Sequence, residues 1–446
     1  MRKLALFRLA YRVSRWLRER LTATGLVLAA LTALAGACGL DTEANLAHML
    51  FSIGTCFLVV DVLAVTLQRL QAPRLAARRH LPDFVTAGEP ARYRIEIWNR
   101  GSKSARACGL AEELGQPWPS ADALAGFRDA VLTNRFDQRV GYPAFVDLLR
   151  RLRGVEVGRA DVPRLLPGQR AAVDLAVAPI ARGLANFQRL SAVLTGPLGL
   201  VEVRVPVAVE NGKLPVLPDR TPVELPPAAR HRLIQPGGIA LAQHIGDSEE
   251  FRSLRDYRPG DPLRAIHWRS FARMGKPIVR EFQEEFFSRH ALVLDTSASY
   301  PFAPAFEKAV SMAAWLIARP RDAESLLDLV FVGDRVHRLM AGRSLGSTDM
   351  LLRVLATLVP TNADSIGPLL RTLERHADQV ASMIAIFLCW DDARRKAVQR
   401  LLARGIRPTV LVVEAGGNSA DVDDAAFTGI LRRIAVSPAA SPVLTP

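Results

Sequence analysis

Residues 290–299 read HALVLDTSAS, and this short stretch decides how the C-terminal part of the chain is organised. An apolar run ends at Asp295, and Ser297 and Ser299 follow at alternate positions. The run predicts a buried strand. A loop at its carboxyl end can turn one carboxylate and two hydroxyls toward one point, and these hard oxygen ligands suit Mg²⁺. Asp and Ser are also favoured helix caps, so the pattern predicts either a metal loop or the cap of a helix that begins near Pro304.

Strands and helices alternate after this loop. Helical patterns cover residues 306–319, 348–358, 366–376 and 392–403, and apolar runs at 326–333, 381–389 and 408–414 predict strands. The alternation predicts that residues 246–436 contain an α/β domain with a doubly wound parallel sheet. Such sheets bind ligands beyond the carboxyl ends of their strands. Asp391 leaves its strand at that edge, where it is either a further metal contact or a helix cap.

The middle of the chain, residues 80–218, has the pattern of a β-sandwich-like domain. Segments such as residues 91–101 and 200–209 alternate apolar and polar residues and end at turn-forming residues. Residues 111–153 form a basic, amphipathic helical insertion that lies either on a membrane surface or against one face of the sandwich. Residues 219–245 are expected to be a connector, and the tail 437–446 is expected to be disordered.

Two apolar segments predict a transmembrane helical hairpin within residues 1–79. Residues 21–40 contain no charge, and residues 47–67 contain only Asp61, so each segment is about long enough to cross a bilayer. Residues 1–79 carry half of the chain's formal net charge of +14. The link between the segments is acidic and both outer flanks are rich in Arg. The positive-inside rule therefore predicts a two-span membrane protein with both termini in the cytoplasm.

Some residues of this region have more than one interpretation. The AGAC run at residues 35–38 resembles the end of a signal peptide with a lipid-modified Cys38, although a second apolar segment follows it. Asp61 is either an intramembrane functional group or a contact that faces the hairpin or a partner. The four cysteines, Cys38, Cys56, Cys108 and Cys389, have no metal-ligand spacing and are expected to be reduced packing residues.

The block before the strand, residues 246–285, mixes large apolar side chains with arginines and acids, so we expect it to be folded and partly buried. It resembles the bacterial family of unknown function DUF58, whose hallmark is Glu-Phe-x-x-Leu-Arg-x-Tyr-x-x-Gly-Asp, then Arg-x-Ile-Asp-Trp-Lys and an Ala-Arg pair. The matching residues are Glu250, Phe251, Leu254, Arg255, Tyr257, Gly260, Asp261, Arg264, Ile266, Trp268, Arg269, Ala272 and Arg273. The hairpin, the β-rich region, the Arg182–Gly183 pair and the GPLGL run at residues 196–200 also resemble that family's layout. The block is either a core that seats the β region against the sheet or a partner-binding surface.

The resemblance implies that the C-terminal domain is similar to a von Willebrand factor A domain. In that domain Asp-x-Ser-x-Ser, a later Thr and a later Asp form a metal-ion-dependent adhesion site, which here implies Asp295, Ser297, Ser299 and Asp391. The family's Gly-Gly-Thr loop reads TNADSIG in this chain, so Asp364 or Ser365 takes the place of the Thr, with Thr361 as a further candidate. His267 and Arg269 also depart from the family's Asp and Lys.

Together these features predict a membrane-anchored, non-catalytic interaction protein whose A-type domain captures an acidic group of a partner through Mg²⁺. The resemblance implies that the protein lies in the bacterial inner membrane, with a MoxR-type AAA+ ATPase as its partner in a cell-envelope-related process. The alternative is a metal-dependent hydrolase that uses Asp295, Asp391 and His267, but the chain lacks a G-x-S-x-G elbow, an H-E-x-x-H helix and a P-loop. Nucleic-acid binding is not expected, because acidic residues alternate with the arginines of residues 249–285.

Overall fold

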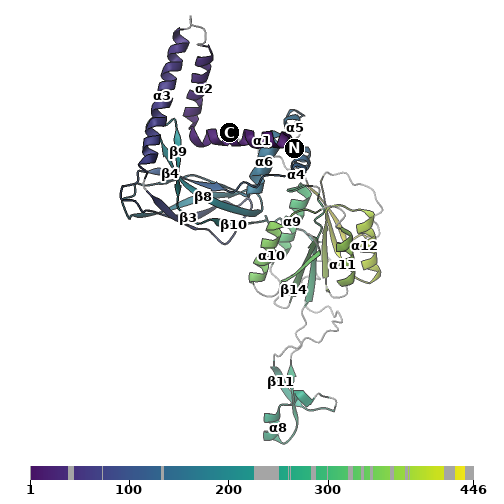
Figure 1. Ribbon diagram of the computed structural model, residues 1–446. Coiled ribbons are helices and arrows are strands. Elements are labelled where there is room, and N and C mark those ends of the chain that lie inside the picture. The colour runs from purple at the N-terminus through teal and green to yellow at the C-terminus, as the bar shows by residue number, and fades with distance from the viewer. Residues whose placement is uncertain are drawn as a thin grey trace.

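The computed structural model describes residues 2–38, 45–72, 74–131, 135–225, 251–259, 261, 263–282, 288–298, 300–319, 325–332, 336–341, 345–361, 366–376, 380, 382–415 and 427–436. They form a multidomain α/β protein with N-terminal helices, a β-rich unit, a small unit of residues 251–282 and a C-terminal unit of strands and helices (Figure 1). Three predicted segments lie wholly or partly outside the described residues, namely residues 41–44 of the acidic link, residues 226–245 of the connector and the tail from residue 437.

The N-terminal helices are α1 (Arg2–Arg20), α2 (Ala23–Cys38) and α3 (Asn45–Leu70). Figure 1 shows α2 and α3 side by side, with α1 running sideways from the foot of α2. Gly54 allows this close approach, because a Cβ there would stand 2.2 Å from the Thr32 hydroxyl. Within the described residues, one helical stretch, Leu46–Leu70, is both long enough and apolar enough to cross a membrane. Helix α2 is apolar but shorter. Helix α1 was expected only as a basic flank.

The β-rich unit has two sheets that share one hydrophobic core. Inward-facing residues such as Ile95, Leu175, Phe187 and Leu214 alternate with exposed ones, as in half-buried antiparallel strands. The first sheet has the order β1 (Leu75–His80), β3 (Ala91–Asn99), β7 (Arg170–Pro179) and β5 (Val155–Val157). The second has the order β2 (Val85–Thr86), β10 (Gly212–Leu217), β8 (Gly183–Thr195), β4 (Cys108–Leu114) and β6 (Ala160–Val162), and β9 (Glu202–Val207) also pairs with β8.

The helical insertion begins later than predicted, because residues 108–114 form β4. Its helices are α4 (Ala121–Val131), α5 (Arg135–Val140) and α6 (Tyr142–Arg153). Phe127, Phe145 and Leu148 are fully buried, and Tyr11 of α1 belongs to the same cluster. The insertion therefore joins α1 to the β-rich unit, and α6 also contacts β5 and β8.

The C-terminal sheet has the order β15-β14-β13-β16-β17-β18, in which β15 pairs antiparallel at one edge and all the other pairs are parallel. Leu292 and Leu294 face α9 and α10, whereas Ala291 and Val293 face α11 and α12, so described helices cover both faces. The strands are β13 (Ser288–Leu294), β14 (Ser325–Val332), β15 (Val336–Ala341), β16 (Ser382–Phe387), β17 (Thr409–Ala415) and β18 (Leu431–Val436). The helices are α9 (Pro304–Ala318), α10 (Leu345–Thr357), α11 (Ile366–His376) and α12 (Asp392–Ala403). Strand β18 was not predicted.

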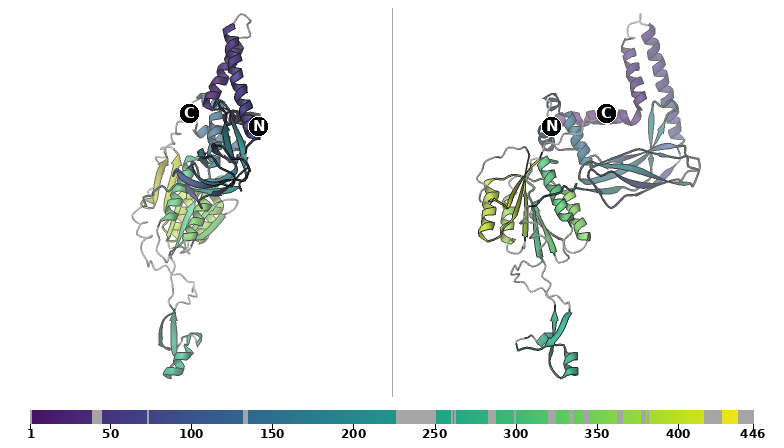
Figure 2. Two further views of the ribbon diagram at one scale, coloured as in Figure 1. Left: turned by 90° about the vertical axis from the view of Figure 1, so that its left-hand side faces the viewer. Right: turned by 180° about the vertical axis from the view of Figure 1, so that it is seen from behind.

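The small unit is an antiparallel pair of strands, β11 (Phe251–Asp256) and β12 (Ile278–Phe282), joined through the short helices η1 (Leu263–Ala265) and α8 (Trp268–Met274). Figures 1 and 2 show it apart from the C-terminal sheet. Ile266, Ile278 and Val279 are buried, but Trp268 is exposed. The block is thus folded, as expected, but its tryptophan does not form a core that seats the β region against the sheet.

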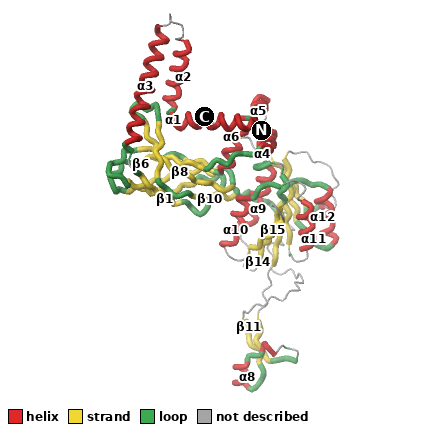
Figure 3. The backbone as a smooth tube through the Cα atoms, viewed as in Figure 1, coloured by secondary structure: helices red, strands yellow, loops and turns green. Residues whose placement is uncertain are grey.

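Figure 3 shows how the strands of the β-rich unit and of the C-terminal sheet form separate bodies. The start of the predicted connector contributes to the second of these bodies. Val223 and Leu225 are buried in the core beneath α9 and α10, and Arg432 of β18 donates to the Glu224 carboxylate at 2.9 Å. This part of the connector is therefore packed.

Candidate functional site

The Asp295 loop lies where the three central strands of the C-terminal sheet end. The Asp295 amide donates to the carbonyl of Ile386 in β16 at 2.9 Å, and the Thr296 hydroxyl donates to the carbonyl of Val332 in β14 at 2.8 Å. Thr361, a candidate fourth ligand, bonds instead to the Thr296 backbone and hydroxyl. These contacts fix Asp295 at the carboxyl edge of the sheet, as predicted from the sequence.

Both carboxylate oxygens of Asp295 are occupied by protein donors. Oδ1 accepts from the Ser297 amide at 2.9 Å and from the Ser297 hydroxyl at 2.5 Å. Oδ2 accepts from the Leu388 amide at 3.2 Å and from Arg394 Nε and Nη2 at 3.0 and 2.5 Å. Asp295 is only 1% exposed, so this buried charge is balanced by Arg394 and not by water.

Arg394 reaches the loop from the first turn of α12. Asp391 caps this helix, since its side chain accepts from the Arg394 amide at 2.9 Å, and it also pairs with Arg394 Nη1 at 2.5 Å. Nη2 donates to the Ser297 hydroxyl at 2.8 Å. One guanidinium group, itself 2% exposed, therefore joins Asp295, Ser297 and Asp391. The sequence predicted that Asp295, Ser297 and Asp391 lie close together, but it did not identify Arg394 as their common partner.

A divalent cation does not fit the described donors as they are arranged. It would need the Asp295 oxygen and the Ser297 hydroxyl that the guanidinium uses, and two cations beside one buried carboxylate would repel each other strongly. Among the described residues, no three or more His, Cys, Asp and Glu side chains gather as metal ligands do. Ser299 and Asp364 lie outside the described residues, so their roles as ligands stay predictions.

The residues of the alternative hydrolase site are not brought together. His267 lies in the small unit, where its Nδ1 is 2.6 Å from the Ser270 hydroxyl. Asp295 and Asp391 bind Arg394 in the C-terminal unit. Neither carboxylate is therefore paired with His267 as a catalytic couple.

The small unit is closed by an ion pair between two of the signature residues. Arg255 donates to both oxygens of Asp261, at 2.7 and 2.8 Å, and the Arg258 amide adds a third hydrogen bond at 2.9 Å. The Arg255 and Arg258 donors lower the pKa of Asp261 to about 2. Glu250 and Gly260 of the signature lie outside the described residues, as does the side chain of Phe251.

Several large apolar side chains of the same unit are exposed. Leu263, Trp268 and Met274 are 68%, 61% and 60% exposed, and the Trp268 ring lies edge-on to Phe271 with 6.0 Å between centroids. Leu254 is also exposed. Exposed arginines accompany them at Arg264, Arg269 and Arg273. We call the exposed apolar residues of η1 and α8, Leu263, Trp268, Phe271 and Met274, the α8 patch.

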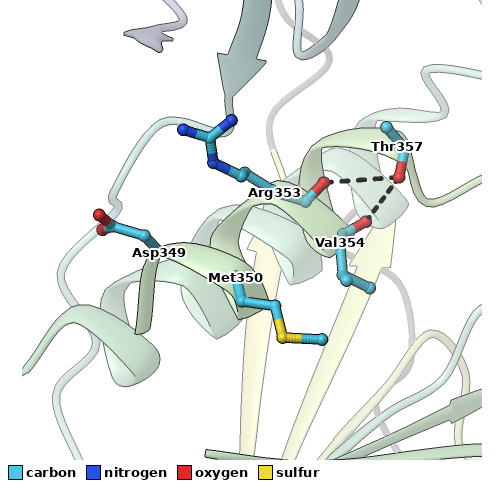
Figure 4. Close-up of a pocket in the computed structure, with 5 residues that line it drawn as sticks. All are labelled: Asp349, Met350, Arg353, Val354 and Thr357. Atoms are coloured by element: carbon cyan, nitrogen blue, oxygen red, sulfur yellow. Dashed lines mark hydrogen bonds between the residues drawn. The ribbon is translucent and has the colours of Figure 1, made fainter. Parts of the chain in front are cut away.

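A shallow hollow of about 470 Å³ lies on α10, and Asp295 does not line it (Figure 4). All its lining residues belong to one helix, and the Thr357 hydroxyl bonds only to carbonyls of the preceding turn. It lacks the converging polar groups that a small-molecule site uses.

Two motifs of the β-rich unit have structural roles. The Arg182 side chain, 5% exposed, reaches the C-terminal unit and donates to the Glu307 carboxylate at 3.0 Å and to the carbonyls of Leu355 and Leu358 at 3.1 and 2.9 Å. The GPLGL turn, residues 196–200, binds Asp61 of α3. Asp61 therefore faces the β-rich unit, and not helix α2.

All four cysteines are free, and only Cys108 is buried, so the expectation of packing residues is wrong for Cys38, Cys56 and Cys389.

Comparison with known proteins agrees with the signature block. Residues 253–414 match the model of a family described as "Protein of unknown function DUF58". The match supports the DUF58 family. It covers the small unit and most of the C-terminal sheet, and the family's description assigns no activity. The chain has no match among curated proteins.

Solved structures resemble only part of the chain. Proximal thread matrix protein 1 from the mussel byssus is 12% identical, with 34% of this chain and 42% of that protein covered and a TM-score of 0.26. The CARDB domain of a Pyrococcus furiosus protein is 13% identical over 31% of this chain and 96% of the domain, with a TM-score of 0.16. These likenesses are too weak to bear on the fold or the function.

Proposed function

We propose that this protein is a membrane-anchored, non-catalytic interaction protein that binds a partner through the small unit of residues 251–282. The observation that carries the proposal is the exposed α8 patch. A tryptophan that is 61% exposed beside an exposed Phe, Leu and Met, on a unit with so small a core, costs solubility unless another surface covers it. Tryptophan is also the residue most enriched at binding hot spots.

The charge of this unit indicates the chemistry of the partner. Arg264, Arg269 and Arg273 are exposed on the same η1 and α8 segment as the α8 patch, whereas the acid Asp261 is already paired with Arg255. An apolar centre with a basic rim fits a partner surface that has an apolar pocket with carboxylates around it. The resemblance to DUF58 suggests a MoxR-type AAA+ ATPase as this partner, in a cell-envelope-related process.

The membrane anchor in this proposal is the pair α2 and α3, which cross the inner membrane as a hairpin with both termini in the cytoplasm. The apolar stretch Leu46–Leu70 supports it, as does the exposure of large apolar side chains along α3, for example Phe57 and Leu63. Basic residues end both α1 and α3 at the base of the hairpin.

The C-terminal unit is assigned in this proposal to a doubly wound, von Willebrand factor A-like fold, supported by its parallel strand order and its helices on both faces. In the adhesion site of such a domain a metal ion supplies a positive charge to the Asp-x-Ser-x-Ser loop. Here Arg394 supplies that charge to Asp295 and Ser297. Partner binding is therefore proposed to be independent of Mg²⁺.

The test is binding of the full chain, in detergent, to the purified MoxR-type ATPase of the same bacterium, by a surface-immobilised binding assay. Trp268→Ala with Phe271→Ala should weaken binding by roughly tenfold to a hundredfold, as for hot-spot residues. The matched control is Met340→Ala, which removes an apolar side chain that is 52% exposed on β15. Equal binding by the wild type and the double variant would exclude the α8 patch as the binding surface. Loss of binding in the presence of a chelator would exclude binding that is independent of Mg²⁺.

A further inference from the structure

We propose that helix α1 lies flat on the membrane surface and binds a bilayer that contains anionic lipids. The inference rests on the proposed membrane anchoring, because it adds a second, peripheral contact to the hairpin. It differs from that anchoring in one respect: α1 touches the lipid headgroup region along its length and does not cross the bilayer.

One face of α1 is apolar and exposed. Leu6, Leu9, Val13 and Trp16 are 61%, 58%, 51% and 52% exposed. Their spacing of three or four residues places them in one stripe along the helix. A stripe of this length, with no described residues packed over it, is typical of a helix whose apolar side enters the headgroup and acyl boundary.

The opposite face of α1 is held firmly by the rest of the protein. Tyr11, 6% exposed, packs with the helical insertion, and its hydroxyl accepts from Arg153 Nη2 at 2.5 Å. Arg8 donates to the Pro119 carbonyl at 3.3 Å and lies 5.7 Å from the centre of the Trp118 ring. These contacts fix the orientation of α1, so its apolar stripe stays on the outside of the protein.

The charge of α1 fits a bilayer better than a second protein surface of ordinary composition. Its 19 residues include Arg2, Lys3, Arg8, Arg12, Arg15, Arg18 and Arg20 but only one acid, Glu19. The Arg20 guanidinium lies 4.8 Å from the centre of the Trp16 ring, so a cation and an interfacial aromatic stand together at the end of the stripe. Basic residues beside an apolar stripe attract anionic headgroups, and tryptophan prefers the membrane interface.

The position of α1 agrees with this role. Figures 1 and 2 show it running sideways from the foot of α2, away from α3 and roughly perpendicular to both helices. At its end, Leu21 forms a bridge to Val201, and the Thr22 amide donates to the Leu200 carbonyl at 3.1 Å. A helix that runs sideways from the foot of a membrane-crossing helix lies along the bilayer surface at the level where that helix leaves the membrane.

The test uses the full chain reconstituted in vesicles of phosphatidylcholine with about 30% phosphatidylglycerol, a typical anionic content. Flotation of the vesicles reports the hairpin anchor, and quenching of tryptophan fluorescence by brominated acyl chains reports contact with lipid. The expected result is quenching that is mostly lost in Trp16→Phe and retained in Trp315→Phe, since Trp315 packs against the core of the C-terminal sheet. Leu9→Lys with Val13→Lys should also reduce the quenching while the protein still floats.

The outcomes separate the two proposals. A protein that floats but whose quenching is the same in Trp16→Phe and the wild type overturns the α1 inference and leaves the anchor intact. The α1 inference is also overturned if the fluorescence emission of Trp16 is blue-shifted but is not quenched by the brominated lipids. The apolar stripe is then covered by another copy of the chain or by another protein. A protein that does not float overturns the anchor and, with it, the role of α1.

Discussion

The backbone amide of Val201 donates a hydrogen bond to the Asp61 carboxylate at 2.8 Å, at the place where helix α3 passes the β-rich unit. The amides of Leu198 and Leu200 add two more bonds at 2.9 Å each, and Asp61 is fully buried. Gly196 makes room for the carboxylate, because a Cβ there would stand 2.2 Å from Asp61 Oδ1. Asp61 therefore links helix α3 to the β-rich unit.

Replacing Asp61 by Ala should destabilise this link. The change leaves three amides of the turn without an acceptor, and an unsatisfied buried donor costs about 1–3 kcal/mol. We expect Asp61→Ala to lower the melting temperature of the purified protein in detergent and to expose the residue 196–201 turn to protease. Val62→Ala, next along α3 and 46% exposed, is the control. Equal melting of Asp61→Ala and the wild type would contradict this role.

Arg182 joins the β-rich unit to the C-terminal sheet, so its removal should uncouple them. Burial raises the pKa of Glu307 and lowers that of Arg182, and the pairing of the two groups opposes both shifts. Removing one partner of a buried pair costs about 3–5 kcal/mol. Arg182 also satisfies carbonyls at the end of α10, which lysine cannot do with the same fork of donors.

We therefore expect Arg182→Ala, and to a lesser degree Arg182→Lys, to split one thermal transition into two in calorimetry. Arg189→Ala is the control, because it removes an exposed arginine from β8, the strand that directly follows Arg182. If Arg182→Ala melts in one transition at the wild-type temperature, the two units are coupled by other contacts.

The C-terminal sheet was largely predictable because its apolar runs and amphipathic helices alternate in regular order. The range of helix α12 follows from its pattern, and Asp391 stands at the cap position that such residues favour. Strand β18 was not predictable in the same way, since Arg432 and Arg433 interrupt its apolar pattern, as charges commonly do in edge strands.

The candidate site was only half predictable. Asp295 and Ser297 were identified as one cluster from their spacing, but Arg394 is one of several basic residues in α12, and no local pattern sets it apart. Only the parallel pairing of β13 with β16 brings the start of α12 beside the Asp295 loop. The partner of Asp61 could not be predicted from local sequence either, because the turn that binds Asp61 lies more than 130 residues further along the chain.

Arg394 should be far more important for stability than its neighbour Arg395. Arg394→Ala leaves Asp295 buried without its cation, at a cost of about 3–5 kcal/mol. Arg395 pairs with the exposed Asp392 at 3.4 Å, and surface pairs contribute about 0–1 kcal/mol, so Arg395→Ala is the matched control. The measurement is the free energy of unfolding from denaturant titration, with and without Mg²⁺.

The wild type should show no change with Mg²⁺ or a chelator, because the guanidinium holds the oxygens that the ion needs. Stabilisation of the wild type by Mg²⁺ would contradict the arginine-filled site. In Arg394→Ala the vacated oxygens of Asp295 and Ser297 should make the variant more stable with Mg²⁺ than without it.

Acid should open the small unit through Asp261. Its folded-state pKa of about 2 is below the ordinary value of 3.8, so the folded unit favours the charged form. The stabilisation from Asp261 is therefore fully present above about pH 4 and is lost as the pH falls toward 2. The fluorescence of Trp268, compared with Trp268→Phe, should report this change in that pH range. Asp261→Asn should remove the acid transition and give the open signal already at neutral pH, whereas Asp256→Asn, which breaks only the exposed pair with Lys276, should titrate like the wild type. An unchanged Trp268 signal between pH 5 and 2 would show that Asp261 does not hold the unit closed.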